Sequence, residues 1–168
     1  MKSSHPIIVF EKKIPGLGSR GLDSFVLKAS HAAGLNGGVS VLITGNSSMR
    51  GLNARFRGKN RPTDVLSFPA AASANGFVGD IAVSLDVAVA NARLLGHSVA
   101  DEIRILILHG ILHLAGYDHE NDHGEMAKEE IVLRKRLALP TGLIERGYKT
   151  KTPKKSAGAT LALARLRP

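Results

Sequence analysis

The chain of 168 residues contains no cysteine. Disulfide bonds and thiolate zinc ligands are therefore excluded, and the composition fits a reducing compartment, for which the cytoplasm is the simplest choice. The chain also lacks any run of about twenty apolar residues, so no membrane span and no membrane partner are expected. Charge returns at Glu11 before a continuous apolar region has formed, so we expect no secretory signal. Internal repeats, a Walker loop and a Rossmann glycine fingerprint are absent as well.

The formal net charge of +9 is unevenly distributed. Residues 146–168 contain seven basic residues and no acidic residue, which accounts for most of the excess. A segment of this composition is expected to be disordered and to add non-specific attraction to nucleic acid. The hydrophobic content of 43% is sufficient for one core. We therefore expect a single catalytic domain over residues 1–145, followed by a basic tail over residues 146–168.

Hydrophobic patterning divides the chain into alternating strands and helices. Apolar, β-branched segments predict strands at residues 5–10, 39–44, 64–68 and 77–85. Apolar residues spaced three and four apart predict helices at about residues 22–33, 46–56, 86–95, 98–114 and 122–139. This order indicates an α+β or α/β domain. We choose α+β, with a single mixed β-sheet of about four to five strands packed with about five helices.

Several local features refine this prediction. Asn46 or Ser47 is expected to cap the second helix, and Asp86 the third. Gly79 and Asp80 interrupt the fourth strand and indicate a bulge or an edge position. The small residues at 69–76 are expected to form a mobile loop.

Three histidines in residues 109–119, HGILHLAGYDH, form a candidate metal site on a zincin-like helix that is apolar enough to be central and buried. His109 and His113 are four residues apart and would project side by side from that helix. Gly116 can end the helix with a positive φ, so that His119 supplies a third nitrogen. A single histidine is more often a packed or exposed side chain than a ligand, and the prediction therefore depends on all three. Three imidazoles leave one position of a tetrahedral zinc ion open, as in catalytic sites, although nickel or copper would also suit them.

An open zinc site favours hydrolysis, because the ion acts as a Lewis acid and lowers the pKa of bound water to near 7. The histidine spacing resembles the metzincin peptidase signature HExxHxxGxxH, which makes a zinc peptidase one alternative. Gly110 stands where that signature has its glutamate general base. Loss of a general base removes a factor of about 10² to 10⁴ in rate, so the peptidase is the less favoured hypothesis.

A second candidate region lies just before the third predicted strand. Four cations fall within seven residues there: Arg55, Arg57, Lys59 and Arg61. Such a run is ordinarily a solvated loop. At the entrance of a strand, however, a rigid sheet could hold a guanidinium over a cleft.

The motif HGILHLAGYDH is similar to HGxLHLxGYDH, the defining motif of the YbeY endoribonuclease family. The segments RFRGKNRPTDVLSFP and VGDIAVS resemble the second and third motifs of that family, and the resemblance spans about residues 52–126. It implies a single-strand-specific, zinc-dependent endoribonuclease that acts in maturation of ribosomal RNA, notably at the 3′ end of 16S rRNA, and in ribosome quality control. The partners it implies are ribosomal RNA, the small ribosomal subunit with its proteins, and a ribosome-associated GTPase.

The resemblance also implies roles for individual residues. The three histidines of the motif, His109, His113 and His119, would hold one zinc ion per chain, and Arg57 would be the catalytic arginine. A planar guanidinium can hold a phosphate with two hydrogen bonds and stabilise charge that develops on it. General attraction to RNA phosphates would come from Arg55, Lys59 and Arg61.

The general base stays open at this stage. Asp118, Glu120 and His123 are nearby candidates, but Asp118 could instead hydrogen-bond a histidine ligand and orient it. His123 lies inside a predicted capping box formed by Asp122 and Glu125 and is expected at the surface. A further alternative to the nuclease is a ribosome-binding assembly factor in which zinc only holds the fold together.

Overall fold

The computed structural model describes residues 5–71 and 76–141. The predicted basic tail and residues 72–75 of the predicted mobile loop lie outside these residues. Within them, no helix has both the length and the apolar character needed to cross a membrane.

Four strands in the described part of the chain form one mixed sheet. They are β1 (Ile7–Phe10), β2 (Gly38–Thr44), β3 (Val65–Pro69) and β4 (Phe77–Ser84), arranged in the order β1-β2-β4-β3. The first three of this order run parallel, and β3 is antiparallel to β4. The prediction of a single mixed sheet in an α+β domain is confirmed.

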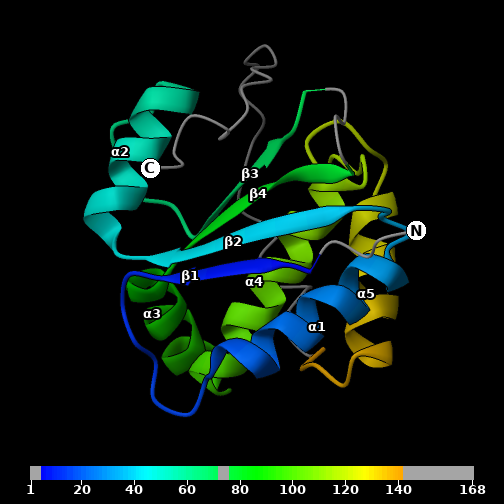
Figure 1. Cartoon of the computed structure of the whole chain (residues 1–168), viewed down its shortest axis with the longest axis horizontal. Helices are drawn as coiled ribbons and strands as arrows, with labels where there is room; N and C mark the ends of the chain where they lie inside the picture. Colours follow the sequence, from blue (N-terminus) through cyan, green and yellow to red (C-terminus); the bar gives the residue numbers. More distant parts are fainter. Residues whose placement is uncertain (1–4, 72–75, 142–168) are drawn as a thin grey trace.

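The described residues form five helices, as predicted: α1 (Ser19–Ala32), α2 (Asn46–Arg57), α3 (Leu85–Leu95), α4 (Val99–Leu114) and α5 (Glu125–Arg136). Helix α2 covers one face of the sheet, and the other four helices lie on the opposite face (Figure 1). Two cores follow from this division. The smaller one joins Met49 and Leu52 of α2 to Leu66 and Phe68 of β3. The larger one lies between the sheet and the four helices.

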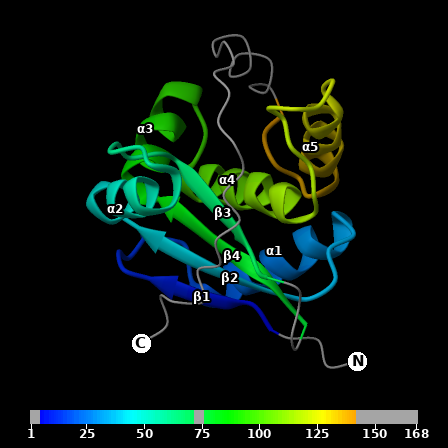
Figure 2. The same ribbon diagram turned by 90° about the horizontal axis from the view of Figure 1, so that it is seen from above.

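Helix α4 runs along the sheet at the centre of the larger core (Figure 2). Its N-terminus is capped by Ser98, whose Oγ accepts a hydrogen bond from the Asp101 N–H at 3.0 Å. Ile103, Ile107 and Ile111 are completely buried. The prediction of a central, buried histidine helix is confirmed, and burial on most sides holds the last turns of α4 in place.

A bulge in β4 brings that strand against the end of α4. The pairing of β4 with β2 skips Val78, so the predicted bulge is confirmed. The alternative prediction, an edge position in the sheet, is wrong because β4 lies between β2 and β3. A Cβ at Gly79 would lie 2.5 Å from the Phe68 carbonyl oxygen and 2.7 Å from Leu114 Cδ2. Glycine is therefore required where the sheet meets the final turn of α4.

The predicted caps at positions 46 or 47 and 86 are wrong. Helix α2 has Gly45 as its N-cap residue, and α3 is capped by Ser84, whose Oγ accepts a hydrogen bond from the Val87 N–H at 3.2 Å. Asp86 instead accepts a hydrogen bond from the Asn46 N–H at 2.7 Å, at the start of the other helix. The first turn of α2 is thus satisfied by a carboxylate from α3, a long-range arrangement that local sequence does not reveal.

A buried hydrogen-bond network stabilises the turn between α3 and α4. His97 Nε2 lies 2.5 Å from Glu102 Oε2, and these side chains are 7% and 4% exposed. Asn91 Nδ2 donates a hydrogen bond to the other carboxylate oxygen at 3.0 Å. The network fixes where α4 begins.

Replacing Glu102 with alanine is expected to lower the free energy of unfolding by about 3–5 kcal/mol, because His97 and Asn91 lose a buried partner. The matched control is Asp101→Ala, which removes a partly exposed pair with Arg104 at 3.2 Å. That change should cost about 1 kcal/mol or less. Urea unfolding of both variants measures the difference, and equal losses would contradict a structural role for the buried network.

Candidate metal centre

The three motif histidines meet at the C-terminal end of α4. His109 and His113 lie one turn apart, and His119 follows on the loop after the helix. One ligand nitrogen from each lies within 4.8 Å of the others. The Nε2 atoms of His109 and His113 are 3.2 Å apart. Two nitrogens bound to tetrahedral zinc at about 2.0–2.1 Å would be separated by about 3.3 Å, so the donor set fits such an ion.

The loop that returns His119 to the helix is built as the sequence predicted. Gly116 has a φ of 98°, and its N–H donates a hydrogen bond to the His113 carbonyl oxygen at 3.0 Å. Asp118 accepts hydrogen bonds from Asn121 Nδ2 at 2.5 Å and the Glu120 N–H at 3.1 Å. The hydrogen bond from Asn121 lowers the pKa of Asp118. Asp118 therefore stabilises the loop, and these bonds do not orient a histidine ring.

The second nitrogen of each helical histidine faces an acceptor. His113 Nδ1 lies 3.0 Å from the Tyr117 carbonyl oxygen, and His109 Nδ1 lies 2.9 Å from Glu130 Oε2. A carbonyl or a carboxylate oxygen can only accept, so each Nδ1 carries the hydrogen in these bonds, and a ring that is neutral then has its lone pair on Nε2. Metal-ligating histidines in proteins are commonly oriented in this way.

The electrostatics of the cluster favour neutral rings at His113 and His119. Burial, followed by the charges of His109 and His119, lowers the pKa of His113 to about 4. Burial also lowers the pKa of His119. Because a metal ion binds the neutral imidazole, both shifts suit a ligand role at neutral pH.

Glu130 contacts a residue of the cluster, and the sequence analysis missed it. Its side chain is 1% exposed on α5, and Arg134 Nη2 donates a hydrogen bond to its Oε1. Burial opposes ionisation, but the hydrogen bond and charge of His109, together with Arg134, lower the pKa of Glu130 to about 2. The one signal in the sequence was the spacing of Glu130 and Arg134, which places them on one helix face.

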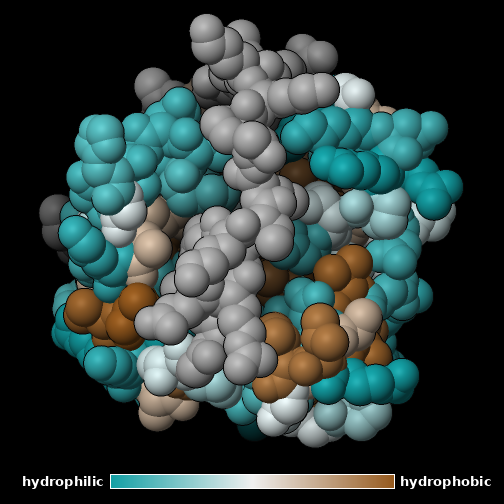
Figure 3. All heavy atoms as spheres, turned by 180° about the vertical axis from the view of Figure 1, so that it is seen from behind, coloured by the Kyte–Doolittle hydropathy of each residue, from teal (hydrophilic) through white to brown (hydrophobic). Residues whose placement is uncertain are grey.

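The predicted cationic residues lie at the C-terminal end of α2 and in the turn after it. All four are exposed: Arg55, Arg57, Lys59 and Arg61. The charge of Arg57 lowers the pKa of His113, but less than burial and the charges of His109 and His119 do, so the field of this guanidinium reaches the cluster from another helix. Figure 3 shows a hydrophilic surface over α2. Among the described residues, no contact of Lys59 or Arg61 with the histidine cluster is seen.

Gly110 faces the sheet and not the histidines. A Cβ at this position would lie 2.9 Å from Ile81 Cγ2 and 3.1 Å from Ser67 Oγ. The Ser67 hydroxyl also donates a hydrogen bond to the Gly110 carbonyl at 3.2 Å. A glutamate could not be accommodated here, which gives a steric reason for the missing peptidase base.

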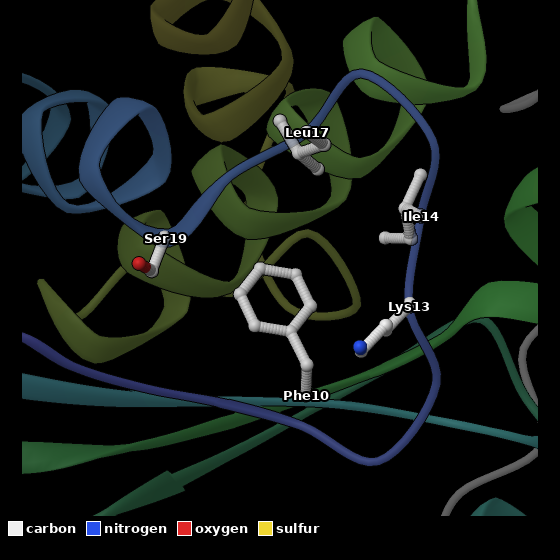
Figure 4. Close-up of a pocket in the computed structure, with 5 residues that line it drawn as sticks. All are labelled: Phe10, Lys13, Ile14, Leu17 and Ser19. Atoms are coloured by element: carbon white, nitrogen blue, oxygen red, sulfur yellow. The ribbon is translucent and has the colours of Figure 1, made fainter.

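A pocket of about 300 Å³ lies elsewhere, in the connection between β1 and α1 (Figure 4). Its lining is mainly apolar and consists of Phe10, Lys13, Ile14, Leu17 and Ser19. It shares no residue with the histidine cluster and does not contribute to the candidate site.

The fold and the cluster together define a class: an α+β protein with three converging histidines, able to hold a metal ion, at the end of a buried helix. The sequence profile of Endoribonuclease YbeY matches residues 17–138. Endoribonuclease YbeY of Koribacter versatilis is 52% identical over 151 residues, covering 90% of this chain and 97% of the relative. That of Solibacter usitatus is 55% identical over 105 residues, covering 62% and 69%. The chain belongs to the YbeY endoribonuclease family.

A solved structure supports the fold. The solution structure of TM1509 from Thermotoga maritima is similar with a TM-score of 0.55 and 28% sequence identity, covering 88% of this chain and 99% of that one.

Replacing Gly110 with alanine is expected to reduce stability. Overpacking costs about 1–3 kcal/mol, which exceeds or cancels the gain in helix propensity of about 1 kcal/mol. Gly51→Ala is the matched control, because Gly51 is an exposed glycine in α2 where an added Cβ would have no neighbour within 4 Å. Urea unfolding should place the Gly51 variant above wild type and the Gly110 variant below it. A Gly110 variant as stable as the control would disprove the close approach.

The metal-free protein is expected to lose stability on acidification. His113 has a folded-state pKa of about 4 against an ordinary value of 6.5, so its contribution is complete above 6.5 and is lost as the pH falls toward 4. Between about pH 7 and pH 4.5 the loss should be on the order of 2 kcal/mol.

Urea unfolding in the presence of a chelator measures this pH dependence. His113→Gln should flatten it, whereas His31→Gln, which removes an exposed histidine of α1, should preserve the wild-type slope. If His113→Gln keeps the full slope, the assignment of the transition to His113 fails.

Proposed function

We propose that the protein is a zinc-dependent endoribonuclease that cleaves single-stranded RNA during maturation of the 3′ end of 16S rRNA and in ribosome quality control, in the cytoplasm. Family membership supports RNA cleavage, because the relatives are named endoribonucleases. The observation that carries the proposal is the convergence of three histidine nitrogens within 4.8 Å of one another, together with the charge of Arg57, which acts on His113. A guanidinium beside a metal centre suits an anionic phosphodiester.

In this proposal, His109, His113 and His119 hold one zinc ion through their converging nitrogens. When bound, zinc would supply Lewis-acid stabilisation of phosphoryl charge and would lower the pKa of a water molecule. Arg57 binds the scissile phosphate and stabilises the negative charge that develops during cleavage. Arg55, Lys59 and Arg61 attract neighbouring phosphates of the strand and position it.

The nucleophile can be water or the RNA 2′-hydroxyl. Asp118 is a weak base because the hydrogen bond from Asn121 lowers its pKa. Glu120 is another nearby carboxylate, and its N–H donates a hydrogen bond to Asp118 Oδ1. Product ends separate the two routes, since attack by the 2′-hydroxyl leaves a cyclic phosphate.

The catalytic domain is proposed to comprise residues 1–145, and residues 146–168 to add attraction to ribosomal RNA. Partners in this proposal are the small ribosomal subunit, its proteins and a ribosome-associated GTPase. RNA affinity should fall steeply with salt, because each neutralised phosphate releases counterions.

Cleavage of a 3′-extended 16S rRNA precursor tests the proposed roles. Arg57→Gln should lower kcat/KM by about 10² to 10³, the usual loss for one group that stabilises transition-state charge, without changing zinc content. Arg50→Gln removes an exposed cation from the same helix and should have little effect. His113→Ala should abolish both zinc binding and cleavage.

Three outcomes would overturn the proposal. Cleavage of casein by the wild type, unaffected by Arg57→Gln, would indicate a peptidase. Intact RNA processing by a zinc-free His113→Ala variant would indicate an assembly factor with a structural metal. Equal losses for the Arg50 and Arg57 variants would remove the specific role of Arg57.

A further inference from the structure

A buried chain of polar groups connects His109 to the C-terminal end of α5. His109 Nδ1 lies 2.9 Å from Glu130 Oε2, and Arg134 Nη2 donates to Glu130 Oε1. Arg134 Nη1 in turn lies 3.4 Å from the Pro140 carbonyl oxygen. Glu130 is 1% exposed and Arg134 is 7% exposed. The chain therefore runs from the candidate metal ligand through the interior to the segment that follows the helix.

Ionised groups are costly to bury, so this arrangement requires an explanation. Removing a carboxylate and a guanidinium from water costs several kcal/mol for each ion, and well-packed apolar residues often serve stability equally well. The neighbouring buried positions on α5, Met126 and Leu133, are indeed apolar. An ion pair with Arg134 would engage one oxygen of Glu130. The other oxygen is directed at the ring of a metal ligand.

We propose that Glu130 is a positioning residue for metal binding: it fixes the orientation of His109 and holds the hydrogen on Nδ1, so that Nε2 is free to bind the ion. This inference rests on the proposed metal centre. Arg134 holds the carboxylate in place from the opposite side. His113 obtains the same orientation from a backbone carbonyl, that of Tyr117. For His109 the acceptor comes from a different helix, so metal affinity depends on how α5 packs against α4.

The variant Glu130→Gln tests the proposal because glutamine has the same shape but one acceptor and one donor. If its oxygen faces His109, its NH₂ group meets the guanidinium of Arg134, where two donors oppose each other. If its NH₂ group faces His109, Nδ1 must accept, and the hydrogen moves to Nε2 at the metal position. Either arrangement weakens zinc binding. Loss of such an outer hydrogen bond typically lowers metal affinity about 10- to 100-fold.

Zinc affinity is measured by competition with a chromophoric chelator on the full chain, after the metal has been removed. Glu130→Gln should bind zinc about 10- to 100-fold more weakly than wild type. Glu129→Gln makes the same chemical change at the adjacent position of α5 and should bind zinc like wild type. Wild-type affinity for Glu130→Gln, or an equal loss for Glu129→Gln, would overturn the inference.

A second measurement needs no variant and is independent of folding defects. Nitrogen NMR of the metal-free wild type, at a pH of about 8 where an ordinary histidine is neutral, reports which nitrogen of His109 carries the hydrogen. Hydrogen on Nδ1 supports the inference, and hydrogen on Nε2 refutes it.

His113→Ala separates this inference from the proposed function. If that variant still binds zinc like wild type, the metal centre itself is wrong. If it loses zinc while Glu130→Gln keeps it, the centre stands and only the role of Glu130 fails.

Discussion

The packing of α4 against β3 and β4 is the constraint on which the candidate site depends. Gly79 lies where a Cβ would be 2.7 Å from Leu114 Cδ2, in the helix turn that carries His113. Gly110, one residue after His109, approaches Ile81 equally closely. Because close-packed interiors resist small displacements, these two contacts set the height and rotation of the last turns of α4. Two imidazoles one turn apart are thereby held at a fixed separation.

The end of the same helix serves the site in two further ways. The last carbonyls of a helix lack intrahelical partners, and the turn at Gly116 reverses the chain so that His119 returns to the cluster. The same reversal places the Tyr117 carbonyl 3.0 Å from His113 Nδ1. Backbone geometry thus orients the ring of His113 and brings His119 back to the cluster. His109 lies one turn earlier, where the helix backbone offers no free carbonyl, and its acceptor is the buried side chain of Glu130.

Local patterns predicted the parts of the structure that local interactions determine. The apolar run of residues 103–114 predicted a central helix. The histidine spacing with Gly116 predicted three converging rings, because helix periodicity sets His109 and His113 and the turn at Gly116 returns the chain. The mixed sheet followed from the order of its strands. The predicted cap residues of α2 and α3 were wrong because the Asp86 carboxylate accepts a hydrogen bond from the Asn46 N–H, which is distant in the sequence. Glu130 was missed for the same reason, since its partner lies on another helix. The electrostatic effect of Arg57 on His113 likewise arises from the tertiary fold and has no local signal.

Gly110 links this packing to the chemistry. In the metzincin arrangement the residue after the first histidine carries the general base, whereas here that position faces Ile81 and Ser67 and has no room for a side chain. The glycine is therefore a requirement of helix–sheet packing. A site built in this way has no base at that position to activate a nucleophile against a neutral amide. An RNA phosphodiester lowers that demand, because its charge can be held by a guanidinium and its own 2′-hydroxyl lies beside the phosphorus. The contact that fixes the histidines thus also favours RNA over a peptide as the substrate.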